Sequence, residues 1–399
     1  HDHYELDRKF DEAGMFSSKR TEFNDQQKAH TQFWNRYDRP PKEEYWDYIV
    51  ERRDLLVPQD VRERKGSFFT PQIWVELSQK YLTDVLGEDW QDEYYIWDCA
   101  AGTGNLLHGL TNKYNIWAST LDMQDVEVMH DRIKNGANLL EDHVFQFDFL
   151  NDEFTKLPKP LQDIIGDPEK RKKLVVYINP PYAEVSSKAI KGKVGVNLTN
   201  THSLYNKILG TAGRELYAQF FIRIYAEIQG CILAEFSKLK TLEGSAFENF
   251  RSFFTTKLIK CFVVPANTFD NVKGQFPIGF KIWDTSINHK LNKIESDVFD
   301  SEGVKIGFKT FYSHHKQNYI NKWISIFKCS IENSIGFMDG INGNDFQHNN
   351  IVYIINSKEQ LPNPRGIWIN KENLIAVSIY LAVRKSIEAT WLNDRDQFL

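Results

Sequence analysis

The residues best placed to do chemistry are the tetrapeptide Asn179-Pro180-Pro181-Tyr182, which follows the apolar run Leu174–Ile178. The two prolines end this run abruptly, because proline cannot continue a β-ladder. A buried strand that stops here would present the Asn179 amide, the Pro180 carbonyl and the Tyr182 ring at its carboxyl end, where open α/β sheets bind ligands. An exocyclic amine could donate one hydrogen to Asn179 and one to Pro180, under the Tyr182 ring. The motif predicts a site for a planar amine, although Pro-Pro before an aromatic is also typical of a stiff loop.

A second candidate site follows another predicted strand, Tyr94–Trp97, which runs into Asp-Cys-Ala-Ala-Gly-Thr-Gly-Asn at residues 98–105. Glycine lets the backbone approach a ligand closely, and the first N–H groups of a following helix face that ligand. The chain has neither G-x-G-x-x-G nor G-x-x-x-x-G-K-[ST] here, which disfavours a pyrophosphate or triphosphate ligand. Asp98 would repel a phosphate and attract an ammonium group. The turn therefore favours a nucleoside cofactor that carries an amino acid, such as S-adenosylmethionine.

Two further predicted strands end in acidic residues. Ile116–Leu121 is followed by Asp122, roughly the interval at which nucleotide-binding folds place an acid on the ribose hydroxyls. His143–Phe147 is followed by Asp148 and Phe149, which could frame an adenine. Each acid alone is explained equally well as a helix N-cap or a solvated loop residue. Four successive strand ends that each carry a suitable polar group favour one shared site.

On these residues the chain resembles the amino-methyltransferases that use S-adenosylmethionine, and specifically the DNA adenine-N6 methyltransferases of restriction–modification systems. Lys65–Pro71, read as KGSFFTP, is similar to the segment with which that family covers the methionine end of the cofactor. The order of this segment, the glycine turn and the Pro-Pro motif resembles the gamma group, which includes type I modification subunits and fused type IIG enzymes. The chain departs from many relatives at Cys99, where they have proline. The resemblance covers most of the chain.

The resemblance implies a role for each matching residue. Asn179, Pro180, Pro181 and Tyr182 are expected to hold a flipped adenine, and Phe276 is expected to cover its other face, with Phe269 as a competitor for that role. The expected substrate is double-stranded DNA, and a specificity or restriction subunit, or a fused nuclease outside this chain, is an expected partner. No metal ion is expected. The residues expected to line the S-adenosylmethionine site are Thr70, Asp98, Ala100, Gly102, Gly104, Asp122, Asp148 and Phe149.

Other functions remain open on the sequence alone. The same tetrapeptide occurs in enzymes that resemble protein-glutamine and RNA methyltransferases, and N4 of cytosine is an alternative target to N6 of adenine. A non-catalytic DNA-binding scaffold that keeps the fold is a candidate from a different class. Asp54 with Glu63 and Lys65 faintly matches the metal-binding pattern of restriction nucleases, but its cramped spacing makes a nuclease site a weak hypothesis.

Composition agrees with a soluble, cytosolic enzyme, and the resemblance implies the cytoplasm of a prokaryote. A chain of 399 residues can form two or three domains, and it contains no apolar run of membrane-spanning length. A net charge of −5 does not mark a nucleic-acid binder, but only the surface that meets phosphates must be positive. Lys188, Lys191 and Lys193 follow the Pro-Pro motif without a nearby acid and would suit a DNA backbone, or simply a solvated loop. The spacing of the cysteines indicates no disulfide framework or zinc site.

The alternation of strand and helix patterns predicts a Rossmann-like α/β sheet of the class I S-adenosylmethionine-dependent methyltransferase type, with helices on both faces. We expect a helical segment over residues 1–64, a methyltransferase domain over 65–287, and a C-terminal extension over 288–399 that begins a target-recognition domain. The last residues show no sign of a natural end, so a truncated chain is expected. The elements predicted within the catalytic domain include a helix from Pro71 to Leu86 capped by Thr70, a helix over 215–229, strands over 231–236 and 258–265, and a reversed strand near one edge at Ile278–Trp283.

Overall fold

The computed structural model forms two units, residues His1–Arg53 and Asp54–Leu399. In the first unit, strand β1 (Tyr4–Phe10) pairs antiparallel with β2 (Phe16–Thr21). Residues 4–10 and 16–21 are therefore strands and not the predicted helix, and Tyr4–Asp7 alternates apolar and charged residues with the period of a strand. Residues 36–64 of the predicted helical segment lie outside the described residues. Those described are 4–10 and 16–21, the single residues 28, 32 and 35, and then 69–182, 199–269, 272, 274–313, 319–341, 352–356 and 365–393.

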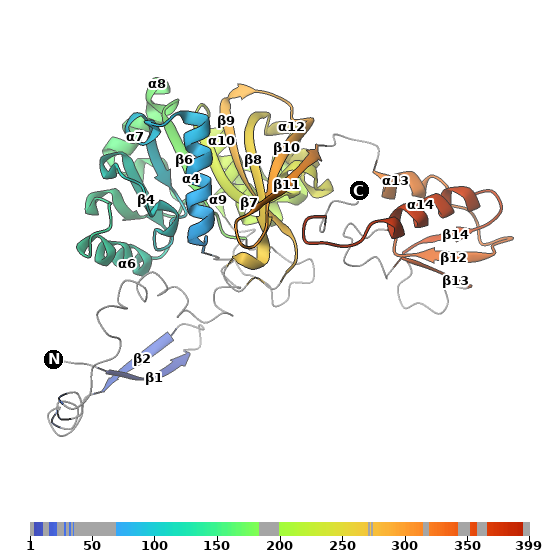
Figure 1. Ribbon diagram of the computed structural model, residues 1–399, viewed down its shortest axis with the longest axis horizontal. Coiled ribbons are helices and arrows are strands. Elements are labelled where there is room, and N and C mark those ends of the chain that lie inside the picture. Colours follow the sequence, from blue (N-terminus) through green and yellow to red (C-terminus); the bar gives the residue numbers. More distant parts are fainter. Residues whose placement is uncertain are drawn as a thin grey trace. The chain divides into compact units, whose positions relative to one another are not determined.

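The second unit is built on a nine-stranded sheet in the order β11-β10-β8-β9-β7-β6-β3-β4-β5 (Figure 1). Its strands are parallel except for β9 and β11, which run antiparallel to their neighbours. The chain order reverses between β3 and β6, so the carboxyl ends of these two strands form the switch point at which open sheets bind ligands. The strands are β3 (Tyr95–Asp98), β4 (Ile116–Thr120), β5 (Val144–Gln146), β6 (Leu174–Ile178), β7 (Ile232–Lys238), β8 (Thr256–Pro265), β9 (Pro277–Asn288), β10 (Lys293–Phe299) and β11 (Lys305–Tyr312).

Two features of the sheet differ from the sequence-based prediction. The reversed strand β9 is present, but it lies between β7 and β8 and pairs with both, rather than near an edge. The sheet also continues past residue 287, because β10 pairs in parallel with β8 and β11 completes the edge. The predicted end of the catalytic domain at 287 therefore cuts through the sheet, which extends to Tyr312.

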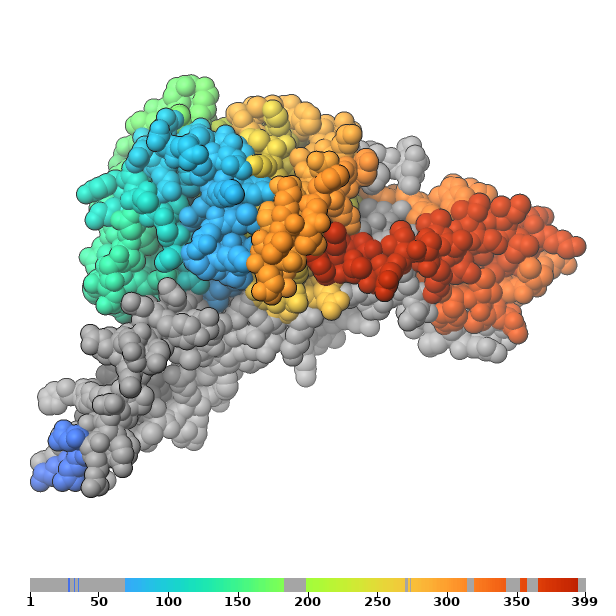
Figure 2. Space-filling view, viewed as in Figure 1, coloured from blue at the N-terminus to red at the C-terminus, as the bar shows by residue number. Residues whose placement is uncertain are grey.

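Helices cover both faces of the sheet, as predicted. On one face, α4 contacts β6 through a 2.5 Å hydrogen bond between Ser78 and Tyr177, and Figure 1 shows this helix in front of the sheet. On the other face, Phe254 at the end of α12 packs edge-on against Trp283 of β9. Figure 2 shows α4 in blue beside β10 and β11 in orange, where Tyr81 donates a hydrogen bond to Asp297, 216 positions away. The helices are α4 (Gln72–Leu86), α5 (Trp90–Glu93), α6 (Met123–Lys134), α7 (Lys159–Gly166), α8 (Pro168–Arg171), α9 (Asn200–Leu209), α10 (Leu216–Glu227), α11 (Lys240–Glu243) and α12 (Glu248–Phe253).

The C-terminal residues form a smaller module with a core of its own. A three-stranded antiparallel sheet in the order β13-β12-β14 carries two helices, and Met338, Val377 and Tyr380 are among its fully buried residues. A role in target recognition for this module remains a prediction. Its elements are α13 (Ile320–Ser325), β12 (Gly336–Asp339), β13 (Tyr353–Ile355), β14 (Ile367–Ile369) and α14 (Leu374–Ser386).

Candidate active site

Asn179 lies directly beyond the end of β6, and its amide is held by two hydroxyl groups. Asn179 Nδ2 donates to Thr70 Oγ1 over 2.8 Å, and Tyr182 Oη donates to Asn179 Oδ1 over 2.7 Å. The prediction that Thr70 caps α4 is wrong, because Pro71 occupies the N-cap position and makes no side-chain cap. Thr70 is buried and serves Asn179 instead. In this arrangement Tyr182 uses the oxygen with which Asn179 is expected to accept a hydrogen from the target amine.

Phe276 lies at the same edge of the sheet as Asn179. It immediately precedes β9, and β9 starts where the parallel neighbours β6 and β7 end. Phe276 is half-buried, and the Lys238 ammonium group lies 6.0 Å from its ring centroid. Phe269, its competitor for the second aromatic cover, is 1% exposed and packs edge-on against Phe236 in the core. Of the two rings, Phe276 is the one that keeps exposed surface.

The Asp98 turn lies beside the Asn179 motif because β3 and β6 are parallel neighbours. Asp98 is 1% exposed and its Oδ1 accepts a hydrogen bond of 3.0 Å from the Ala100 N–H. Burial raises the pKa of Asp98 to about 7, and the Ala100 hydrogen bond offsets only part of that rise. Gly102 and Gly104 have φ angles of 53° and 84°, in the left-handed region that glycine adopts without strain. The turn thus buries a carboxyl group at the edge of the sheet.

Asp122 follows β4 and occupies the N-cap position of α6, at the same edge of the sheet as Asp98. Two apolar side chains that the sequence did not mark as site residues flank Asp122. Leu121 is 60% exposed and Met123 is 51% exposed. Exposed apolar side chains beside an acid at the start of a helix suit a ligand that has a hydroxyl-bearing part and a flat apolar part. In the sequence, the Leu-Asp-Met tripeptide directly after a predicted strand could have indicated these two residues.

The structure treats Asp148 and Phe149 differently. Asp148 is half-buried; its Oδ1 accepts from the N–H groups of Leu150 and Asn151, and its Oδ2 accepts from Asn151 Nδ2 over 2.7 Å. Phe149 is 2% exposed and stacks on Phe220, with ring centroids 5.0 Å apart. Its ring belongs to the core, so the structure does not bring it to the predicted cofactor site.

A buried ion pair underlies the Asn179 motif. Glu235 is the β7 partner of Ile178, and its carboxylate lies 3.2 Å from the ammonium group of Lys281 on β9, with both side chains fully buried. Trp283 Nε1 also donates to Glu235, and Lys281 donates to Ser237 Oγ over 2.7 Å. Burial raises the pKa of Glu235 to about 7, while Lys281 acts to lower it.

A cavity of about 370 Å³ lies between the glycine residues that end the Asp98 turn and the end of α6. Arg132 Nη1 borders it and donates to Thr103 O over 2.6 Å and to Asn105 Oδ1 over 2.9 Å. Of the predicted cofactor residues, only Gly104 lines this cavity. The cavity therefore does not match the cofactor site that the sequence predicts. Its lining includes Thr103, Gly104, Leu107, His108, Met129 and Arg132.

Several residues named in the sequence-based predictions lie outside the part of the chain that the structure describes. Lys188, Lys191, Lys193 and the segment 65–68 lie outside the described residues, as do Asp54 and Glu63. Within the ranges that the structure describes, no three His, Cys, Asp or Glu side chains gather as a metal ion would require. In the same part of the chain, no helix has the length and apolar character needed to cross a lipid bilayer.

No protein-family model and no curated protein matches the sequence. Solved structures similar to the chain include a DrdV–DNA complex, at 13% identity and a TM-score of 0.47 over 66% of this chain and 32% of that one. A type I restriction–modification methyltransferase subunit from Streptococcus thermophilus has 17% identity and a TM-score of 0.42, over 67% and 54% of the two chains. The type ISP enzyme LlaBIII bound to DNA has 14% identity and a TM-score of 0.44, over 74% and 26%. The chain thus spans between about a quarter and about half of the length of these three proteins.

The sheet itself defines the class of fold. Taken from β5 towards β8, the order of the first seven sheet strands along the chain reads 3-2-1-4-5-7-6, with the seventh strand reversed. This is the Rossmann-like class I S-adenosylmethionine-dependent methyltransferase sheet, with helices on both faces, as the sequence predicts.

Proposed function

We propose that this chain is an S-adenosylmethionine-dependent DNA methyltransferase that modifies N6 of a flipped-out adenine, as part of a restriction–modification system. One observation carries the proposal: the Asn179 motif and the Asp98 turn follow adjacent parallel strands at the switch point of the sheet. An amine held at the first site would therefore lie next to a cofactor held at the second.

Methyl transfer from a sulfonium ion is an in-line displacement, so positioning supplies most of the barrier reduction. The Asn179 oxygen and the Pro180 carbonyl would each accept one hydrogen of the target amine. These two bonds would favour a tetrahedral nitrogen and direct its lone pair at the methyl group. S-adenosylmethionine supplies that methyl group when bound, and Asp98 would hold its ammonium group by charge attraction.

An adenine amine in duplex DNA faces its pairing partner, so the base has to leave the stack at a cost of a few kcal/mol. Aromatic faces offset part of this cost. Tyr182 and Phe276 belong to segments at the same edge of the sheet, and Phe276 keeps exposed surface. Lys238, near the Phe276 ring, is paired with Glu215 over 3.6 Å, so its charge is balanced within the protein.

The test is to supply S-adenosylmethionine with a deuterated methyl group together with unmodified genomic DNA, RNA or a release factor, and to identify labelled products by mass spectrometry. We expect labelled N6-methyldeoxyadenosine. Asn179→Ala should retain cofactor binding and lose methyl transfer by about a thousandfold or more. Asn206→Ala, at an exposed position of α9, is the matched control and should behave as the wild type. Label found only in RNA, in protein or at N4 of cytosine would contradict the proposed substrate.

A further inference from the structure

The loop that follows β5 is tied to α9 and α10 through four consecutive backbone carbonyls. Arg223 donates from Nη1 to Phe149 O and from Nη2 to Asp152 O, the latter over 2.8 Å. The carbonyls between them accept from the start of α9. Leu150 O accepts from Thr201 N and Oγ1 over 3.0 and 2.8 Å, and Asn151 O accepts from Asn200 Nδ2 over 2.9 Å. We call Asn200, Thr201 and Arg223 the carbonyl clamp.

The position of the Arg223 side chain is itself fixed by neighbouring residues. It is 6% exposed, its Nε lies 3.1 Å from a carboxylate oxygen of Glu227, and its guanidinium lies 4.5 Å from the ring centroid of Phe154. Asn200 grips the loop twice, because its backbone N–H also donates to Asn151 Oδ1 over 2.9 Å. The loop is therefore held by groups whose own positions are set by packing and charge.

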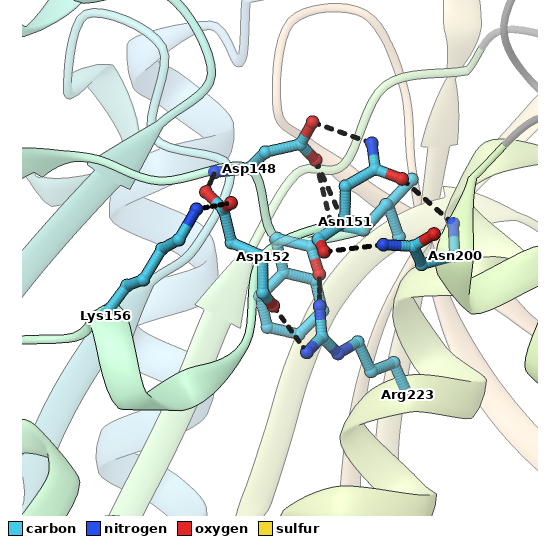
Figure 3. A network of polar contacts seen from close by, with 8 residues as sticks. Asp148, Asn151, Asp152, Lys156, Asn200 and Arg223 are labelled. Carbon is cyan, nitrogen blue, oxygen red and sulfur yellow. Dashed lines mark hydrogen bonds and ion pairs between the residues drawn. The ribbon is translucent and has the colours of Figure 1, made fainter.

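Arg223 reaches the loop from the side opposite to Asp148, while Asn200 binds the Asn151 side chain that in turn bonds to Asp148. Figure 3 shows the Asp148 carboxylate and the Arg223 guanidinium on opposite sides of the loop. Among the described residues, Asp148 Oδ1 accepts two hydrogen bonds from backbone N–H groups, whereas Oδ2 accepts one, from Asn151 Nδ2. A carboxylate oxygen accepts about two hydrogen bonds, so Oδ2 can take a further donor.

We propose that the carbonyl clamp positions Asp148 to accept a hydrogen from the exocyclic amine of the cofactor's adenine, and so sets the selectivity for that purine. The inference rests on the proposed function. Selectivity of this kind requires the acceptor to be held within about 0.5 Å of its productive place. Asp148 gains that precision from residues that touch the loop and not the cofactor, so Asn200, Thr201 and Arg223 are positioning residues.

The test compares the binding of S-adenosylhomocysteine with that of S-inosylhomocysteine, whose oxo group replaces the amine, by titration calorimetry. A hydrogen bond to a charged acceptor predicts that the wild type prefers the adenine compound by about tenfold or more. Asn200→Ala and Arg223→Lys should each reduce that preference to below about threefold, because the loop loses part of its hold. Asn206→Ala, in the same helix as Asn200, should keep the wild-type preference.

The ratio of the two affinities separates a positioning role from a purely structural one. A clamp that only stabilises the fold would lower both affinities together, or lower the melting temperature without changing the ratio, and either result overturns the inference. Asn200→Ala keeps the test decisive if Arg223→Lys does not fold. Failure of the wild type to bind either compound would contradict the proposed function itself, which is a different result from binding with an unchanged ratio in the variants.

Discussion

Asn179 is held by the hydroxyl groups of Thr70 and Tyr182, and these two contacts have different consequences. The Tyr182 contact uses the same oxygen that a target amine needs, but an amide oxygen can accept two hydrogen bonds, so Tyr182 would share this oxygen with the amine. The Thr70 contact uses the amide nitrogen and can persist. Thr70 therefore fixes the direction of the Asn179 amide without competing with the amine for its oxygen.

Removing the Thr70 hydroxyl should lower turnover without removing the cofactor. Thr70→Val keeps the shape of the side chain but removes the hydrogen bond from Asn179 Nδ2 to Thr70 Oγ1. We expect the rate of methyl transfer to fall by about tenfold to a hundredfold, equivalent to roughly 1.4–3 kcal/mol. Thr70→Ser restores the acceptor and should restore most of the rate. Equal rates for Thr70→Val and the wild type, measured under single-turnover conditions, would show that this hydrogen bond does not orient Asn179.

Asp98 predicts a pH dependence of cofactor binding. Its pKa of about 7 means that the carboxyl group is mostly neutral at pH 6 and mostly ionised at pH 8. An ammonium group is attracted by the ionised form, so affinity for S-adenosylhomocysteine should rise by about tenfold between these pH values. Calorimetry at the two pH values measures this change. Asp98→Asn should bind more weakly and show no such rise, and a pH-independent wild type would contradict the role of Asp98.

The same group affects the stability of the free protein. The folded-state pKa lies above the ordinary value of 3.8, so stability falls as the pH rises from about 4 to about 7. Asp98→Asn removes the buried charge and should raise the melting temperature of the ligand-free protein at pH 8. Asp98→Asn should therefore weaken cofactor binding and raise the melting temperature, as expected for a buried charge that serves binding and costs stability. A lower melting temperature for Asp98→Asn at pH 8 would count against it.

The sequence predicted where the site residues lie along the strands better than it predicted what their side chains contact. Asn179, Asp98 and Asp122 lie at strand ends because short apolar runs mark the strands and polar residues mark where they stop. Phe149 has the same position after a strand, but Phe220 and Arg223 hold its ring in the core. Those partners are more than 70 positions away and cannot be found from the local pattern. The pairing of Thr70 with Asn179 is hidden for the same reason.

At the scale of the elements, the Glu235–Lys281 pair links β7 to the reversed strand β9 beneath the Asn179 motif. Lys281→Met would leave a fully buried carboxylate without its cation. We expect a loss of about 3–5 kcal/mol in the free energy of unfolding, measured by urea denaturation. Replacing both partners by apolar residues, in Glu235→Leu with Lys281→Met, should recover most of that loss. A loss below about 1 kcal/mol for Lys281→Met alone would show that Glu235 does not depend on Lys281 for charge compensation.

The strands were predicted more reliably than their arrangement. The run Leu174–Ile178 coincides with β6 because all five residues are buried, which gives a continuous apolar segment. The reversal of β9 followed from its alternating pattern, but its place between β7 and β8 depends on pairing with two distant strands. The edge strands β10 and β11 were missed because few of their residues are buried: Ser296, Val298 and Phe299 in β10, and Phe311 alone in β11.

For the whole molecule, the central expectation is that a cofactor hollow and a base hollow meet at the carboxyl ends of β3 and β6. A crystal structure of the protein with S-adenosylhomocysteine tests this most directly. We predict that the sulfur atom lies between Gly102 and Asn179, with the ribose hydroxyls against Asp122 and the adenine beside Asp148. Density for the nucleoside in the 370 Å³ cavity lined by Leu107 and His108, with the edge at Asn179 covered, would contradict it.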